Sequence, residues 1–335
     1  MRYRAFGPSG IRISDLILGT MMFGDGTDWV GRRTADAAGA RAIYDAYRTA
    51  GGNTIDTANR YTDGLSEQVV GDLVKAERDA VVLSTKYTLT FDGTDPNAAG
   101  NHRKSLRRSV HQSLDRLGTD YIDILWVHVW DALTPIEETM RAIDDLVTRG
   151  TVLAVGISDT PAWVVAKANT WAQAASRTPF SAIQVPYSAA ARDVERELLP
   201  MAASLGLSVA AWSPLSGGLL SGRYADPEAA ASLDQEHERR VAMAVAEVAA
   251  ETGHTSAQVA LAWLMSRPGA PHPIIGSTKV EQVVDTLAAA DLVLDEGQLA
   301  RITDAAPVDL GFPGAFIAGT VEFVNGPVAS RVVGL

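Results

Sequence analysis

The sequence predicts an α/β fold of the (β/α)8 TIM barrel type, because short apolar runs alternate with helix-like segments along the whole chain. Most of these runs start roughly 27 to 42 residues apart, a spacing typical of parallel strands joined by helices. Eight runs can be counted, and eight parallel strands close such a barrel. The runs lie at residues 16–18, 54–55, 81–83, 122–127, 152–157, 182–185, 209–211 and 273–275.

Helix-like segments separate the runs, and one of them is an insertion. The interval before the last run spans about 60 residues and contains an extra Ala-rich helix at residues 239–251. No linker or low-complexity stretch interrupts the chain, so we expect one domain over residues 1–335. The other helices are predicted at residues 35–50, 105–117, 136–149, 161–175, 194–205 and 256–266.

The two ends of the chain differ from this repeating pattern. Residues 3–13 predict two short strands around a Pro-Ser-Gly turn, and such a hairpin could plug one end of the barrel. Residues 306–335 contain Gly and Pro but little periodicity. We therefore expect a C-terminal loop on the surface or over the active-site end.

The composition disfavours several classes of protein. The chain has no cysteine and its six histidines are scattered, so neither a disulfide framework nor a metal site is expected. A formal charge of −11 disfavours nucleic acid or an anionic membrane as a partner. The sequence shows neither a signal peptide nor a transmembrane run, which suits a cytoplasmic protein. One basic cluster has the spacing of a solvated helix face: Arg103, Lys104, Arg107 and Arg108.

Polar residues occupy the predicted carboxyl ends of the strands, the end that carries the active site in such barrels. Taken singly, Asp56 could cap a helix, Lys86 could be a surface lysine, and His128 could be a satisfied core histidine. Together with Tyr61, however, they converge on one mouth of the barrel. This convergence favours a catalytic group.

These four residue types suit the reduction of a carbonyl. A carbonyl that accepts a hydride becomes an alkoxide, so a donor such as Tyr61 must supply a proton. The ammonium of Lys86 would lower the pKa of the phenol toward working pH, and Asp56 would pair with the buried ammonium. The imidazole of His128 would hold the carbonyl oxygen in line with the phenol.

Several segments resemble the aldo-keto reductase family. Residues 53–71 contain Asp-Thr-Ala, then Tyr61, then Ser-Glu and Gly, in the order of the family signature. Residues 83–86 and 120–128 resemble the segments that carry the family's lysine and histidine. The resemblance extends over nearly the whole chain and implies a reductase whose catalytic tetrad is Asp56, Tyr61, Lys86 and His128.

The resemblance also implies a nicotinamide dinucleotide bound across the barrel mouth without a Rossmann domain. The chain indeed lacks Gly-x-Gly-x-x-Gly after its first strand. Trp212 resembles the aromatic residue that stacks on the nicotinamide, with a buried core tryptophan as the alternative. Gln184 resembles the residue that binds the carboxamide. The candidate cofactor-binding residues are Thr20, Met21, Asp56, Ser158, Asp159, Gln184, Trp212, Ser213, Pro214, Leu215, Gly217, Arg223, Gly276, Thr278, Lys279, Gln282, Asp285 and Thr286.

Two positions depart from the family pattern. Asp159 stands where the family usually has Asn, and an acid can accept a hydrogen bond from the carboxamide but cannot donate one. The Arg often found at the adenosine 2′-phosphate is absent, which leaves Thr278, Lys279 and Gln282 for this contact. We expect NADPH to be preferred over NADH.

Residues 156–165 are similar to the aryl-alcohol dehydrogenase branch, which implies an aromatic or bulky aldehyde as the small-molecule substrate. Trp29, Trp130 and residues 312–323 could form apolar walls or simply pack elsewhere. A sugar-nucleotide or natural-product ketone is an alternative substrate, and a cofactor-sensing subunit with little turnover is an alternative function. Lys86 could also form a Schiff base, as in an aldolase, but an aldolase has no use for the dinucleotide segments.

Overall fold

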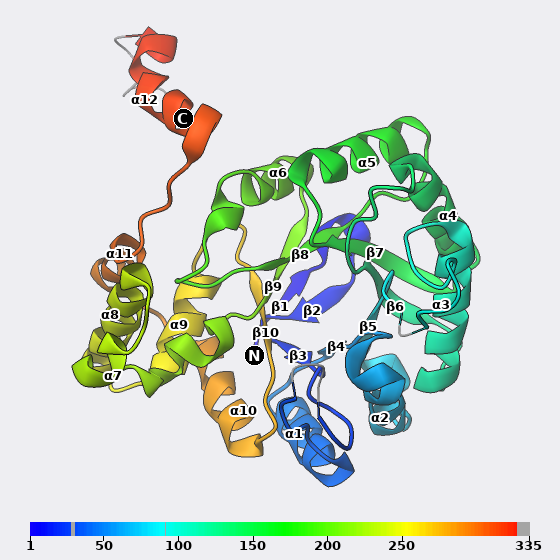
Figure 1. Cartoon of the computed structure of the whole chain (residues 1–335), viewed down its shortest axis with the longest axis horizontal. Coiled ribbons are helices and arrows are strands. Elements are labelled where there is room, and N and C mark those ends of the chain that lie inside the picture. The colour runs from blue at the N-terminus through cyan, green and yellow to red at the C-terminus, as the bar shows by residue number, and fades with distance from the viewer. Residues whose placement is uncertain (28–30, 91, 327–335) are drawn as a thin grey trace.

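Eight parallel strands close into a barrel, as the sequence predicts. The structure is a computed structural model, and it describes residues 1–27, 31–90 and 92–326. The last strand pairs with the first, with Ile274 opposite Ile17. Figure 1 shows the ring of strands surrounded by helices. The barrel strands are β3 (Ile17–Gly19), β4 (Thr54–Asp56), β5 (Val82–Tyr87), β6 (Ile122–Val127), β7 (Val152–Ser158), β8 (Ala182–Pro186), β9 (Ser208–Trp212) and β10 (His272–Ile275).

The strand β5 is longer than its apolar run predicts. The run at 81–83 ends where polar residues begin, but the strand continues through Ser84, Thr85 and Lys86, all of which are buried. Apolar residues alone therefore predict the end of β5 too early, because the strand continues through polar residues that are buried.

The helices cover the outside of the barrel, and the predicted insertion is confirmed. It contains α7 (Pro227–Ala231) and α8 (Glu236–Thr252) between β9 and β10. The sequence did not predict α2, whose Ser66 and Glu67 are buried, so no clean polar face marks it as helical. The remaining helices of the body are α1 (Ala37–Thr49), α2 (Leu65–Val74), α3 (Arg103–Leu117), α4 (Ile136–Thr148), α5 (Ala162–Ala174), α6 (Leu198–Leu205), α9 (Ser256–Met265), α10 (Val280–Leu287) and α11 (Glu296–Asp304).

The predicted N-terminal hairpin is confirmed and closes one end of the barrel. Its strands β1 (Tyr3–Ala5) and β2 (Arg12–Ser14) pair antiparallel. Phe6 and Ile13 are each 1% exposed and cluster with the residues that open β3 and β5. The ring of Phe6 meets that of Trp126 edge to face, with 5.7 Å between ring centroids. The hairpin is therefore the floor of the barrel, opposite the carboxyl ends of the strands.

The prediction of a C-terminal loop over the active site is wrong for the described part of the tail. Residues Gly311–Asn325 form a helix, α12, that stands apart from the ring of helices (Figure 1). Its apolar residues lie on all sides, with Phe312 88% and Phe323 87% exposed, so the sequence lacks the one-sided pattern that marks a packed helix. Pro313 lies in the first turn, where its missing N–H costs little.

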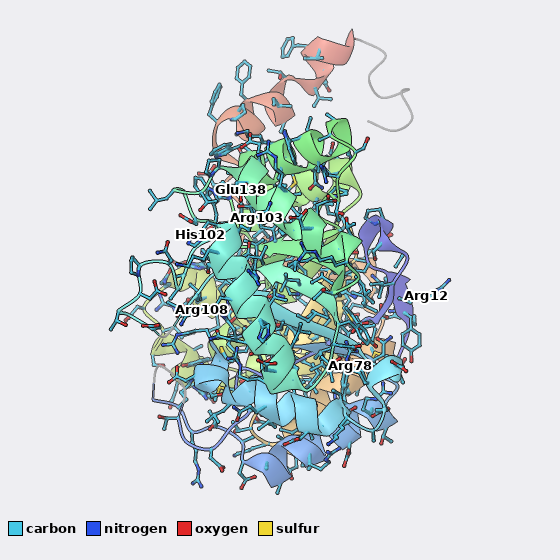
Figure 2. All side chains as sticks on the ribbon, turned by 90° about the vertical axis from the view of Figure 1, so that its right-hand side faces the viewer. Arg12, Arg78, His102, Arg103, Arg108 and Glu138 are labelled. Atoms are coloured by element: carbon cyan, nitrogen blue, oxygen red, sulfur yellow. The ribbon has the colours of Figure 1, made fainter. Side chains whose placement is uncertain are left out.

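The basic cluster lies on α3 and is matched by acidic neighbours. Arg103 lies 3.2 Å from Glu138 on α4, and the two side chains lie close together in Figure 2. Arg108 pairs with Asp92 at 3.1 Å and Asp95 at 2.7 Å. These ion pairs offset the positive charge of the face. No helix within the described parts of the chain has the length and apolar character needed to cross a membrane.

Gly156 in β7 makes room for the aromatic contact beneath the barrel. A Cβ atom at this position would lie 2.2 Å from the Trp126 ring. We predict that Gly156→Ala lowers the free energy of unfolding by about 1–3 kcal/mol, because the ring must shift in a packed core. Urea denaturation would measure it. Gly93→Ala is a matched control, since no atom of the described residues beyond its chain neighbours lies within 4 Å of the added Cβ there. Equal midpoints for the two variants would contradict the prediction.

Candidate active site

A cavity of about 1390 Å³ opens at the carboxyl ends of the barrel strands. It has the size of a site for an extended small molecule. Most of the candidate residues lie in its wall, although they come from segments spread over the whole chain. The predicted residues that line it are Met21, Asp56, Tyr61, His128, Ser158, Asp159, Gln184, Trp212, Ser213, Pro214, Leu215, Gly217, Arg223, Gly276, Gln282, Asp285 and Thr286.

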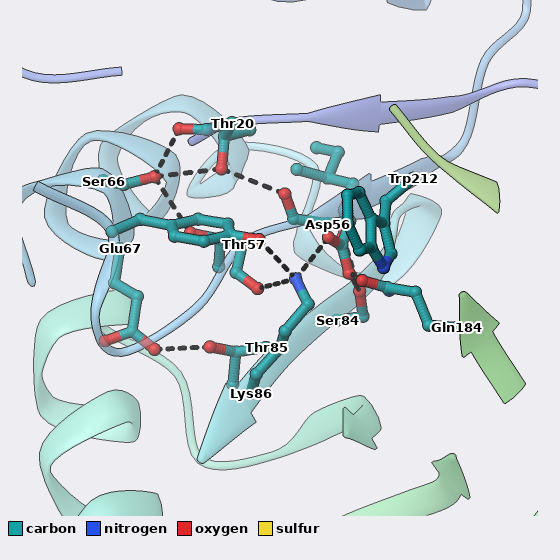
Figure 3. Close-up of polar contacts among 12 residues, drawn as sticks. Thr20, Asp56, Thr57, Ser66, Glu67, Ser84, Thr85, Lys86, Gln184 and Trp212 are labelled. Carbon is teal, nitrogen blue, oxygen red and sulfur yellow. Dashed lines mark hydrogen bonds and ion pairs between the residues drawn. The ribbon is translucent and has the colours of Figure 1, made fainter. Parts of the chain in front are cut away.

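The ammonium of Lys86 is the centre of the polar network beneath this cavity (Figure 3). Lys86 is 1% exposed, so the surface-lysine interpretation is wrong. Its Nζ donates to the Asp56 carboxylate, to the Thr57 carbonyl oxygen at 2.8 Å and to the Tyr61 hydroxyl at 3.1 Å. These contacts match the donor capacity of an ammonium. An ammonium held in this way is a poor nucleophile, which argues against a Schiff base.

The carboxylate of Asp56 is held by three donors from two strands. Besides Lys86 on β5, it accepts from Ser84 Oγ at 2.7 Å and from Gln184 Nε2 on β8 at 3.2 Å. The helix-cap interpretation is wrong, because its side-chain partners are other side chains of the barrel. Gln184, expected at the carboxamide, has its amide nitrogen engaged with Asp56.

The pKa values of Lys86 and Tyr61 are both raised, whereas the sequence predicted a lowered pKa for Tyr61. Burial by itself lowers the pKa of Lys86, but Asp56 and Tyr61 outweigh it, and the pKa of Lys86 is raised above its ordinary value. Burial likewise raises the pKa of Tyr61, Asp56 adds to this, and Lys86 opposes it. The expected net lowering of the pKa of Tyr61 is therefore wrong, because burial, together with Asp56, outweighs the lowering effect of the ammonium. The phenol stays protonated at neutral pH, which is the form a proton donor needs.

His128 faces the phenol across the cavity wall. The two rings are T-shaped, with 6.0 Å between the centroids of Tyr61 and His128. Burial lowers the pKa of His128 to about 3, and the charge of Lys86 acts in the same direction, so the imidazole is neutral. Its buried Nδ1 has no hydrogen-bond partner among the described residues. The satisfied-core interpretation is therefore wrong, and His128 also lines the cavity, where its ring can contact a ligand.

Trp212 and Asp159 form a second polar contact at the mouth. Trp212 is 36% exposed and lines the cavity, so the buried-core alternative is wrong. Its Nε1 donates to Asp159 Oδ1 at 3.1 Å. Asp159 has φ 44°, a left-handed conformation that Asp and Asn tolerate better than most residues. Burial raises the pKa of Asp159, while the Trp212 bond and the charge of Lys86 oppose the rise.

The outer part of the cavity is formed by two loops. After β9 the backbone turns sharply, with positive φ at Ser213 and Gly217, a conformation that also occurs in anion-binding turns. After β10, Gln282 accepts from Ser277, and Asp285 accepts from Thr255 Oγ1 at 2.9 Å. Asp285 thus also fastens α10 to the start of α9.

Besides Lys86, which lies beneath the cavity, three candidates lie outside the lining. Thr20 is fully buried and donates to the Asp56 carbonyl oxygen at 3.1 Å, so it supports the site from behind. Thr278 and Lys279 lie between lining residues in the sequence but do not line the cavity. Lys279 is exposed at the start of α10.

The expected apolar walls are mostly elsewhere. Trp130 packs edge to face on Trp163, with 5.7 Å between centroids, and is not in the lining. Residues 312–323 belong to the projecting α12, and Trp29 lies outside the described residues. Met22 and Leu89 line the cavity and were missed. Their positions in the loops after β3 and β5 are the signal that could have revealed them.

We predict that Lys86→Met lowers the free energy of unfolding by about 3–5 kcal/mol, because it leaves the Asp56 carboxylate buried without its counter-charge. The double variant Lys86→Met/Asp56→Asn is expected to regain part of the loss. Urea denaturation would measure both. Arg301→Met, which breaks the exposed pair with Glu251, is a matched control and is expected to change stability little. A loss no larger than in the control would contradict the buried-pair interpretation.

Comparison with known proteins agrees with this geometry. The model of the Aldo/keto reductase family matches residues 15–307. The chain is 41% identical over 335 aligned residues to norsolorinic acid reductase A of Aspergillus parasiticus, covering 95% of this chain and 84% of that protein. It is 38% identical over 337 residues to aryl-alcohol dehydrogenase (NADP(+)) of Phanerodontia chrysosporium, covering 93% and 88%. The chain therefore belongs to the aldo/keto reductase family, and it is an oxidoreductase of the NAD(P)H-dependent, carbonyl-reducing type.

Proposed function

We propose that this protein reduces aldehydes or ketones to alcohols with NADPH, and that Tyr61 is the proton donor. The observation that carries the proposal is the Tyr61 hydroxyl, held 3.1 Å from the buried Lys86 ammonium in the wall of the cavity. A neutral, buried phenol beside a fixed positive charge can release a proton when negative charge develops on a neighbouring oxygen.

The residues of the cavity fit a nicotinamide dinucleotide. His128 and the 36% exposed Trp212 line the cavity, and the loop after β9, with its positive φ angles, suits a phosphate group. Trp212 and Ser213 to Gly217 would hold it on one side and Gly276 to Thr286 on the other. The reduced nicotinamide, when bound, supplies the hydride.

Each polar residue then has a distinct part in handling the proton. Tyr61 gives the proton from its hydroxyl to the carbonyl oxygen, and Lys86 stabilises the phenolate that remains. Asp56 keeps the ammonium in place, and Ser84 and Gln184 keep Asp56 in place. The neutral imidazole of His128 orients the carbonyl oxygen by hydrogen bonding, because it cannot act as an acid with a pKa near 3.

Two observations support NADPH as the cofactor. Lys279 is an exposed cation at the start of α10, next to the outer part of the cavity, where a 2′-phosphate would need a positive charge. The relative from Phanerodontia chrysosporium carries NADP(+) in its name. Lys279, Thr278 and Gln282 would share this contact.

An aromatic or other bulky carbonyl compound is the substrate that we favour. Met22 and Leu89 give the cavity apolar wall, and its volume leaves room for a ring system. One of the relatives described above is named an aryl-alcohol dehydrogenase, which points to an aromatic substrate, and the other is named a norsolorinic acid reductase. A panel of benzaldehydes and polycyclic aromatic ketones, assayed by NADPH consumption, would test the assignment. Faster turnover of small aliphatic aldehydes than of every aromatic member would contradict it.

We predict that Tyr61→Phe lowers kcat for carbonyl reduction by about 10³-fold while the Kd of NADPH changes less than about twofold, because only the proton donor is lost. Stopped-flow reduction and calorimetric titration would measure the two quantities. Tyr121→Phe, which removes a hydroxyl bonded to Asp79 outside the cavity, is the matched control. Near-normal reduction by Tyr61→Phe would reject the assignment of the donor.

The rate of reduction is predicted to be flat from about pH 6.5 to 9 and to fall only as pH approaches the pKa of Tyr61. His128 is already neutral across this window, and the raised pKa values of Tyr61 and Lys86 keep both protonated. A kcat profile for a saturating aldehyde would check this. A bell-shaped profile with an apparent pKa near 7 would mean that another group limits the proton transfer.

A further inference from the structure

The charges at the inner end of the cavity do not cancel. The Lys86 ammonium is paired with the Asp56 carboxylate, and the imidazole of His128 is neutral. That leaves Asp159, whose hydrogen-bond partners, the indole of Trp212 and Ser158, are uncharged. Among the described residues no Lys, Arg or His forms an ion pair with Asp159, so its carboxylate is a negative charge that no salt bridge neutralises, although the more distant Lys86 acts on it.

The carboxylate of Asp159 is fixed in position by the barrel. Asp159 directly follows β7, and its backbone N–H donates to the Gln184 carbonyl oxygen on β8 at 3.4 Å. The bond from Trp212 Nε1 orients the side chain at 3.1 Å. The charge acts on the reacting groups, since it contributes to the raised pKa of Tyr61 and interacts with Lys86. Asp159 therefore lies in the same wall as the phenol and faces the same space.

We propose that Asp159 makes this site discriminate between the two redox forms of the nucleotide, favouring the oxidised form, whose nicotinamide ring is a cation. The inference rests on the proposed binding of the nicotinamide beside Trp212. The reduced ring is neutral, so a fixed carboxylate stabilises the oxidised form over the reduced form in a cavity that water only partly screens. An amide at the same position would hold the indole equally well but would lack this preference.

A preference for the oxidised nucleotide would favour carbonyl reduction over alcohol oxidation. Carbonyl reduction adds a hydride and a proton to the substrate and converts a neutral ring into a cationic one. Asp159 would therefore shift the equilibrium between bound reactants and bound products toward the alcohol. It would also hold the oxidised nucleotide more tightly after the reaction, and thus slow its release.

The test compares the Kd of NADP+ with the Kd of NADPH by isothermal titration calorimetry at pH 7.5. Asp159→Asn removes the charge but keeps an acceptor for the indole. We expect the ratio of the two Kd values, NADP+ over NADPH, to rise about tenfold, the order expected for losing one screened charge interaction near a protein surface. Asp159→Ser removes the charge with a smaller side chain and is expected to shift the ratio in the same direction.

Two variants separate this effect from others. Glu281→Gln makes the same change of charge in the outer part of the cavity, so it is expected to alter both Kd values alike and leave their ratio unchanged. Trp212→Phe removes the hydrogen bond but keeps the carboxylate, so its ratio is expected to stay within about twofold of the unmodified protein.

The outcomes distinguish the inference from the function on which it rests. An unchanged ratio in Asp159→Asn and Asp159→Ser, with both nucleotides still bound, would overturn the role of Asp159 and leave the reductase proposal intact. A ratio shifted as strongly by Glu281→Gln would also overturn it, because the effect would then be one of net charge. Failure of the unmodified protein to bind either nucleotide would instead refute the proposed function.

Discussion

The buried pair of Lys86 and Asp56 is the interaction on which the rest of the site depends. Removing two charges from water costs several kcal/mol for each ion, and only close partners offset this cost. Those partners come from β4, β5 and β8, and Gln184 lies 128 residues from Asp56 in the sequence. The network can therefore form only when the barrel has closed, and the fold and the chemistry are linked by one set of hydrogen bonds.

The same pair of Lys86 and Asp56 influences the protonation state of the neighbouring Tyr61. Because burial, together with Asp56, outweighs the effect of the ammonium, Lys86 does not lower the pKa of Tyr61 below its ordinary value. The phenol of Tyr61 is therefore protonated at neutral pH and can donate a proton. The neutral His128 adds no charge, and Asp159 adds one negative charge beside the phenol. Under the role proposed for Asp159, a site built in this way would favour one direction of the reaction before any substrate has bound.

The sequence was informative where structure and chemistry repeat along the chain. Eight apolar runs predicted the eight strands, and polar residues at their carboxyl ends predicted which side chains would meet. What it could not give depends on contacts between distant residues. Nothing near Gln184 shows that its amide pairs with Asp56, and nothing near Thr20 shows that its hydroxyl lies behind the cavity. The projecting α12 was missed for a local reason, since a helix that is apolar on all sides has no amphipathic period.

The floor of the barrel has a consequence for how this chain can vary in evolution. Phe6 rests on Trp126, and Trp126 occupies the space that a side chain at Gly156 would need. These three positions, on the hairpin, β6 and β7, form one steric unit, so a change at one is tolerated only with a compensating change at another. Homologues in which these three positions change together would keep the same packing beneath the barrel. Homologues in which they change independently would close this end of the barrel in another way.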